Sequence, residues 1–173
     1  GMAEACRELD FPVVSGNVSL YNETDGIAIP PTPVVGGVGL IEDLSKVATL
    51  NGAQPGDTLV VVGETKGHLG ASLYAREWLG LKGDDLGTPP QVNLAIEAKN
   101  AAFVREMIRQ AKVTSAHDVS EGGLICAAID MALATGIGII IDPTIHKDLT
   151  NCTWLFGEDQ ARTLVSVSED CLS

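Results

Sequence analysis

Two short polar loops contain the residue types that bind a metal ion or a phosphate group. The first loop, Ser15-Gly16-Asn17-Val18-Ser19, follows an apolar stretch at Phe11–Val14 that we predict to be a short strand. Loops at the carboxyl ends of strands often bind ligands in α/β proteins. Gly16 allows a phosphate to approach the backbone, the Asn17 side-chain oxygen can coordinate Mg²⁺, and the Ser19 hydroxyl can bind a substrate. The same residues also fit an ordinary polar turn.

The second loop, His117-Asp118-Val119-Ser120-Glu121-Gly122-Gly123, lies between a predicted strand and an apolar helix. Gly122 and Gly123 are expected to expose backbone N–H groups at the start of the helix, where the macrodipole favours an anion. Asp118 could then hold a metal ion and Ser120 a phosphate. An equally open alternative is that Asp118 or Ser120 only caps the helix.

Two further charged segments favour structural roles. The segment Gly63–Gly70 lacks the spacing of a phosphate-binding P-loop, so we predict a strand-to-helix turn there. We predict that the segment Gly157–Arg162 is a solvated turn before the last strand. No Ser–His–Asp or Cys–His arrangement stands out, and we therefore assign no catalytic residue.

Alternating strands and helices must position these loops, which predicts an α/β fold with a mixed sheet. The helix at 92–112 has an apolar face at helical spacing, and the helix at 124–134 is apolar nearly all round and is expected to be buried. A helix ending near Leu79 is also expected. The predicted strands are 11–14, 34–41, 59–62, 113–116, 137–141 and 164–167.

The rigid Pro30-Pro31-Thr32-Pro33 segment predicts a domain boundary, with residues 1–29 closing one subdomain and 30–173 forming the next. Both ends of the chain fall within expected helices, so we expect a piece of a longer protein.

Composition excludes several classes of partner. The chain has 11 Lys plus Arg against 23 Asp plus Glu, a formal net charge of −12, so the basic surface that nucleic acids require is missing. No apolar run is long enough to span a membrane, and the N-terminus does not resemble a signal peptide. The four cysteines have no metal-ligand spacing and fit buried thiols in a reducing, cytoplasmic compartment.

Several stretches together resemble one enzyme family. They are SGNVSLYNET (15–24), PPTPVVGGVGL (30–40), GDTLVVVGETKGHLGAS (56–72), AHDVSEGGL (116–124) and LFGEDQAR (155–162). This combination resembles the synthetase (large catalytic) subunit of phosphoribosylformylglycinamidine synthase, in the superfamily that includes aminoimidazole ribonucleotide synthetase. The resemblance spans essentially the whole chain. It implies a three-layer α/β/α (α+β) C-terminal subdomain with a partly ferredoxin-like topology.

The resemblance also implies a reaction. ATP phosphorylates the formamide oxygen of formylglycinamide ribonucleotide, and ammonia then displaces the phosphate. A glutaminase subunit supplies the ammonia, and a small third subunit completes the separate-subunit form. By position, Gly16 and Ser120 correspond to ATP contacts, Asn17 and Asp118 to Mg²⁺ ligands, and Ser19 to a substrate contact.

The catalytic histidine and main nucleotide-binding half of the family lie upstream of the matched residues, so the isolated chain is expected to be inactive. Two alternatives remain open. The chain could belong to another ATP-dependent synthetase of the superfamily, or to a non-catalytic, pseudo-symmetric half that holds a nucleotide without turning it over.

Overall fold

The computed structural model describes residues 1–19, 21–142 and 144–172, and these form two compact units, Gly1–Glu42 and Asp43–Ser173. The division after Glu42 falls later than the Pro30–Pro33 segment. A domain boundary at residues 29 and 30 remains a prediction.

The smaller unit contains helix α1 (Met2–Glu8) and a hairpin of β1 (Glu23–Thr24) and β2 (Ile27–Ala28). Asp25 and Gly26 connect the two strands with φ of 53° and 77°, the backbone of a type I′ hairpin turn.

Two predicted strands of this unit are wrong. Residues 11–14 and 34–41 are irregular, and Val34 and Val38 are almost fully exposed. Both runs have the apolar composition of a strand, but neither pairs with another strand among the described residues of the unit. Without a partner, the backbone groups of a strand have no ladder to join.

The larger unit is built on a three-stranded sheet of β3 (Thr58–Val62), β4 (Ser115–Asp118) and β5 (Thr163–Val167). Its strand order is β3-β5-β4, and β5 pairs antiparallel with both neighbours. The expected mixed sheet is therefore corrected to antiparallel pairing for the described strands. Because β3 and β4 run parallel on either side of β5, the β3-helix-β4 unit is a split β-α-β, which agrees with a partly ferredoxin-like topology.

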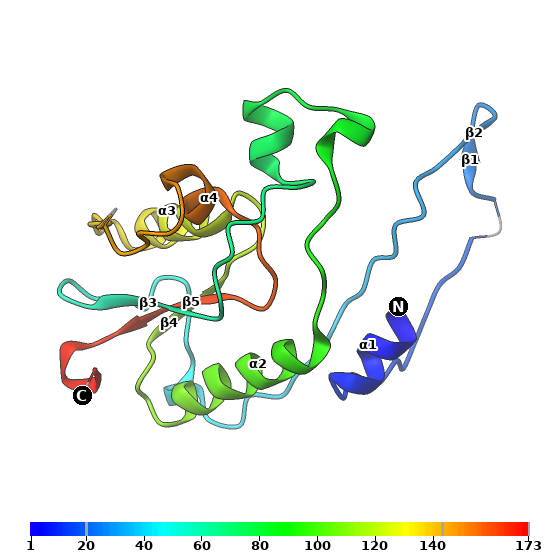
Figure 1. The fold of residues 1–173 in the computed structure, drawn as a ribbon. Coiled ribbons are helices and arrows are strands. Elements are labelled where there is room, and N and C mark those ends of the chain that lie inside the picture. The colour runs from blue at the N-terminus through cyan, green and yellow to red at the C-terminus, as the bar shows by residue number, and fades with distance from the viewer. Residues whose placement is uncertain (20, 143, 173) are drawn as a thin grey trace. The chain divides into compact units, whose positions relative to one another are not determined.

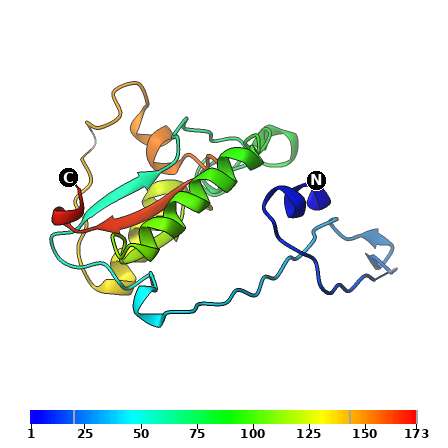
Figure 2. The same cartoon turned by 90° about the horizontal axis from the view of Figure 1, so that it is seen from below.

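Helices cover both faces of this sheet, which confirms the three-layer α+β architecture (Figure 1). Helix α2 (Leu94–Arg109) covers one face, whereas α3 (Gly123–Thr135) and α4 (Asn151–Phe156) cover the other. Figure 2, seen from below, shows α2 in front of the strands and α3 behind them.

The side-chain alternation of the strands separates two apolar cores. Leu59, Val61 and Leu164 face the core with α3 and α4. The intervening residues of the same strands face the core under α2: Val60, Val62 and Val165, with Val104 and Met107 of the helix. One sheet thus supports two layers of helix.

Two of the predicted helices are confirmed, α2 and α3. Asn93 is the N-cap of α2, and its side chain accepts a hydrogen bond from the Ile96 N–H at 3.1 Å. Helix α2 confirms the helix expected over 92–112. Helix α3 confirms the helix expected over 124–134, but it is not buried all round, because Ile129 and Leu133 are exposed.

Other elements differ from the sequence interpretation. Of the helix expected to end near Leu79, only Tyr74–Trp78 is helical, as a π-helical turn. Residues 137–141 have no regular secondary structure and no strand pairing. Helix α4 was not predicted; its signature is the Thr150 cap, which accepts a bond from the Thr153 N–H at 3.2 Å. Short 3₁₀ turns occur at Leu44–Lys46, Gly83–Leu86 and Glu169–Cys171. None of the described helices has the length and apolar character needed to cross a bilayer.

Candidate functional site

The loop that contains Gly16, Asn17 and Ser19 is an exposed polar turn in the smaller unit. The Ser19 hydroxyl donates to the Tyr21 carbonyl oxygen at 3.1 Å, and the Asn22 side-chain amide donates to the Ser19 carbonyl oxygen at 2.9 Å. A Cβ atom added at Gly16 would meet no atom within 4 Å. Packing among the described residues thus gives no steric reason for a glycine at position 16.

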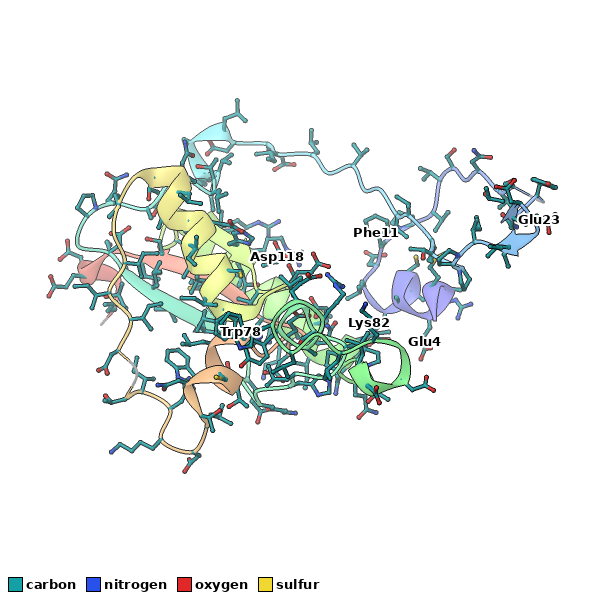
Figure 3. The ribbon with its side chains drawn as sticks, turned by 90° about the horizontal axis from the view of Figure 1, so that it is seen from above. Glu4, Phe11, Glu23, Trp78, Lys82 and Asp118 are labelled. Atoms are coloured by element: carbon teal, nitrogen blue, oxygen red, sulfur yellow. The ribbon has the colours of Figure 1, made fainter. Side chains whose placement is uncertain are left out.

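The second predicted loop follows β4 in the larger unit, and Asp118 is the last residue of that strand (Figure 3). Its side chain is 76% exposed. Hydrogen bonding from Ser120 lowers the pKa of the Asp118 carboxyl, and neighbouring His117 acts in the same direction, whereas partial burial opposes both. Asp118 is therefore ionised at neutral pH and open to solvent beside a hydroxyl group.

His117 lies between two carboxylates. Its Nδ1 is 3.2 Å from the Asp118 carboxylate, and its Nε2 is 3.4 Å from the carboxylate of Asp130 on α3. The His117 ring thus links the loop to the middle of the helix that follows it.

The start of α3 differs from the free anion site that the sequence suggested. The Gly122 N–H donates to Oε1 of Glu158 at 2.8 Å, and the Gly123 N–H donates to the Ser120 carbonyl oxygen at 3.1 Å. Both backbone groups are therefore used within the chain. The capping alternative is wrong as well, because the N-cap residue is Gly122, which has no side chain to accept a cap hydrogen bond.

Packing explains the two glycines. Gly122 and Gly123 have φ of 77° and 70°. A Cβ atom at Gly123 would lie 2.6 Å from the Gly157 carbonyl oxygen, and one at Gly122 would collide with Cys126. Left-handed backbone and close approach to the segment after α4 therefore both require glycine here.

The segment Gly157–Arg162 is a buried polar network, so the prediction of a solvated turn is wrong. The Asp159 carboxylate accepts three backbone bonds, from the N–H groups of Lys66 at 2.9 Å, Gly67 at 2.8 Å and His68 at 3.2 Å. The buried Arg162 guanidinium donates to the carbonyl oxygens of Gly157 and Asp159. These charges are buried because each has polar partners within the chain.

This network also determines the form of the Gly63–Gly70 segment. It is a loop after β3 rather than an immediate strand-to-helix turn, since the first helical residue is Tyr74. The His68 side chain is engaged, because its Nε2 lies 2.9 Å from the Thr88 carbonyl oxygen. A polar cavity of about 560 Å³ borders the loop and includes Lys66, His68 and Gln160 in its lining.

A second cavity, of about 360 Å³, borders Gly122. Aromatic and aliphatic side chains line it, including Leu73, Tyr74 and Phe156. Two cysteines, Cys126 and Cys152, also border it, and all four cysteines of the chain are free thiols.

The described residues offer a partial set of magnesium ligands. No three His, Cys, Asp or Glu side chains in the described part of the chain form a metal-binding group. Mg²⁺, however, usually keeps several waters and takes only one or two protein carboxylates together with substrate phosphates. The ionised, exposed Asp118 fits such a single-carboxylate role.

Sequence reasoning missed Glu158, Asp159 and Arg162 as members of the network that supports the Asp118 loop. Charges in a glycine-flanked segment resemble a surface turn, and their amide partners lie far away along the chain, as with the separation of 92 residues between Gly67 and Asp159. The position of the segment directly before the buried strand β5 was the available sign of burial.

Comparisons with known proteins agree with the resemblance noted in the sequence. The family model of the AIR synthase related protein, C-terminal domain, matches residues 54–170. Phosphoribosylformylglycinamidine synthase subunit PurL of Caulobacter vibrioides is 55% identical over 169 residues, which cover 98% of this chain and 22% of that protein. The subunit of the same name from Parvibaculum lavamentivorans is 50% identical over 170 residues, 98% of this chain and 23% of its own length.

Solved structures share the fold. T. maritima PurL complexed with FGAR superposes with a TM-score of 0.61 at 22% sequence identity, covering 74% of this chain and 22% of that one. T. maritima PurL complexed with ATP gives a TM-score of 0.53 at 19% identity, covering 75% and 20%. The chain spans less than a quarter of the length of the relatives that it matches.

Proposed function

Because the chain belongs to the AIR synthase related protein, C-terminal domain, family, we propose that it is part of the large subunit of a phosphoribosylformylglycinamidine synthase. The observation that carries this proposal is the 55% identity over 98% of the chain with the C. vibrioides subunit. The complete enzyme would be an ATP-dependent carbon–nitrogen ligase of purine biosynthesis. It would convert formylglycinamide ribonucleotide, ATP and ammonia to the amidine.

Within that enzyme, we propose that Asp118 coordinates Mg²⁺ and that Ser120 binds the nucleotide phosphates. The ionised Asp118 side chain is open to solvent, and the Ser120 hydroxyl that lowers its pKa lies beside it. A bound Mg²⁺ would offset the negative charge of the transferring phosphoryl group. These two residues would orient the metal and the phosphate rather than exchange protons with the substrate.

For the smaller unit, we propose that Gly16 contacts ATP, Asn17 coordinates Mg²⁺ and Ser19 contacts the substrate. Gly16 is exposed, so its backbone is accessible to a ligand. The Ser19 hydroxyl is held by a neighbouring carbonyl oxygen, which fixes its direction before any substrate is bound.

We further propose a glutaminase subunit and a small third subunit as partners, and a cytoplasmic location. A structure of PurLQS from T. maritima is among the solved relatives, at a TM-score of 0.54 and 22% identity. The four free thiols suit a reducing compartment.

A chimeric enzyme tests the proposal. The corresponding segment of the C. vibrioides subunit is replaced by residues 1–173, and amidine formation is assayed with the glutaminase and small subunits present. We expect the chimera to be active and Asn17→Ala or Asp118→Ala to lower its activity at least about tenfold, the scale of a lost charge-stabilising contact. The exposed Asp84→Asn serves as the matched carboxylate control and is expected to change nothing.

The outcomes separate the alternatives. A folded, assembled chimera without activity would contradict the synthase assignment and favour another synthetase of the superfamily. Full activity of Asp118→Ala, combined with loss of Mg·ADP binding by calorimetry, would support a nucleotide-holding half without a catalytic role. Unchanged activity and unchanged binding in both variants would remove the proposed roles.

A further inference from the structure

Glu158 joins two distant parts of the larger unit through one carboxylate oxygen. Its Oε1 accepts the Gly122 N–H at 2.8 Å and the Leu73 N–H at 2.7 Å. Gly122 is the N-cap of the 13-residue helix α3, so a negative charge is placed where the helix macrodipole favours one. The anion at this helix start is therefore supplied by the chain itself.

The loop before α3 has a second attachment to the same segment. The Val119 N–H donates to the Arg162 carbonyl oxygen at 3.1 Å. The Val119 and Gly122 attachments lie on either side of Ser120, and both lead to the segment 157–162. The side chains of Asp118 and Ser120 nevertheless remain exposed.

Glu158 is itself fixed in place. Its backbone N–H donates to the His68 carbonyl oxygen at 2.8 Å, while the next residue, Asp159, binds the backbone of residues 66–68. The backbone at Glu158 is therefore held by hydrogen bonds, and its side-chain Oε1 accepts from two backbone N–H groups. This arrangement suits a residue that orients a loop better than one that receives a ligand.

We infer that Glu158 is a positioning residue, which holds the Gly122 amide and thereby orients the loop that presents Asp118 and Ser120. The inference rests on the proposed function for its consequence, because a correctly oriented loop matters there for binding Mg²⁺ and the nucleotide phosphates. In this role Glu158 needs no contact with the nucleotide or the metal. It acts through the backbone of residues 119–122.

Two substitutions separate geometry from charge. Glu158→Gln keeps the side-chain length and an oxygen that can accept both amides, but it removes the charge. Glu158→Asp keeps the charge but is one methylene shorter, so it cannot reach both amides. We expect hydrogen exchange of the Gly122 and Leu73 amides, measured by NMR on the 173-residue chain, to rise about tenfold or more in Glu158→Asp and to stay near wild type in Glu158→Gln.

Nucleotide binding is measured on the same proteins. Calorimetry with Mg·ADP, at a temperature where circular dichroism shows each variant folded, is expected to give about tenfold weaker binding for Glu158→Asp. Glu158→Gln is expected to retain most of the wild-type affinity for Mg·ADP.

Asp57→Ala is the matched control for a merely structural effect. The Asp57 carboxylate also accepts two bonds, from the Ser166 hydroxyl at 2.6 Å and the Gln54 N–H at 3.0 Å, but it precedes β3, at the end of the sheet opposite Asp118. This variant is expected to lower the unfolding midpoint while leaving Gly122 exchange and Mg·ADP affinity unchanged.

An unchanged hydrogen-exchange rate of the Gly122 amide in Glu158→Asp would overturn the inference. An equal rise of that rate in Asp57→Ala would overturn it too. So would faster Gly122 exchange in Glu158→Asp with unchanged Mg·ADP affinity. If the wild-type chain binds no Mg·ADP, the proposed nucleotide role of Asp118 and Ser120 fails, whereas the exchange comparison still decides whether Glu158 holds the loop.

Discussion

The Arg162 guanidinium lies 3.9 Å from the Asp159 carboxylate, and both side chains are almost completely buried. Burial lowers the pKa of Arg162, while Asp159 and Glu158 act in the opposite direction. A buried ion pair is stable only when hydrogen bonds satisfy the remaining donors and acceptors. Here three backbone N–H groups donate hydrogen bonds to the Asp159 carboxylate, and the Arg162 guanidinium donates to backbone carbonyl oxygens.

Removing the Arg162 cation should destabilise the larger unit strongly. Arg162→Met leaves Asp159 buried without its positive partner, and we expect a loss of about 3–5 kcal/mol in the free energy of unfolding. Arg162→Lys keeps the charge but loses the planar set of donors, so a smaller loss is expected. Urea unfolding followed by circular dichroism measures both. Equal losses in the two variants would show that donor geometry, and not charge, determines the effect.

A side chain at Gly123 should disturb the packing of α3 on the segment after α4. Gly123→Ala forces an L-residue to φ of 70° and places its Cβ atom 2.6 Å from the Gly157 carbonyl oxygen. The backbone conformation alone costs about 1–3 kcal/mol, and the collision adds to it. Gly138→Ala is the matched control, since a Cβ there meets nothing within 4 Å, and its thermal midpoint should stay close to wild type.

The acid titration of Asp118 should depend on Ser120. Because the pKa of Asp118 is lowered in the folded chain, its contribution to stability is present above the unfolded pKa, near 3.9, and is lost as the pH falls through the folded value. Ser120→Ala removes the principal cause and should raise the pKa of Asp118 toward its ordinary value. NMR titration of the Asp118 carboxyl carbon measures the change. An unaltered midpoint would assign the lowering to the Asp118 backbone N–H and to His117 instead.

The two faces of α3 should respond differently to substitution. Met131 is 1% exposed in the core against the sheet, so Met131→Ala is expected to cost about 2–5 kcal/mol. Leu133 is 77% exposed, and Leu133→Gln should change the free energy of unfolding by less than about 0.5 kcal/mol. Chemical denaturation of the two variants in parallel tests whether this face of α3 is free in solution.

Local patterns sufficed to predict the elements that depend on neighbouring residues. The 3.6-residue periodicity located α2 and α3, and the compact β-branched runs located β3 and β5. These features depend on backbone preference and on apolar spacing within a short stretch of chain.

Features that depend on distant partners were not predictable in the same way. The stretch Ile137–Ile141 has the composition of a strand but lacks pairing, and the charges at Glu158 and Asp159 resemble a surface turn until their amide partners are located. The candidate loop at Asp118 was found from its residue types, yet its attachments at Val119 and Gly122 come from a segment about forty residues later, a separation that a single sequence does not reveal.

The central position of β5 has a consequence for the order of assembly. Among the described strands, β3 and β4 pair only with β5, which is the last to leave the ribosome. Until residues 163–167 emerge, the nascent chain holds the apolar strand β3 and the more polar β4, both with open edges and no ladder between them. The sheet must then form in one late step, by insertion of β5 between strands that are already synthesised. A chain halted before Thr163 would expose both edges at once, and is the species on which chaperones would act.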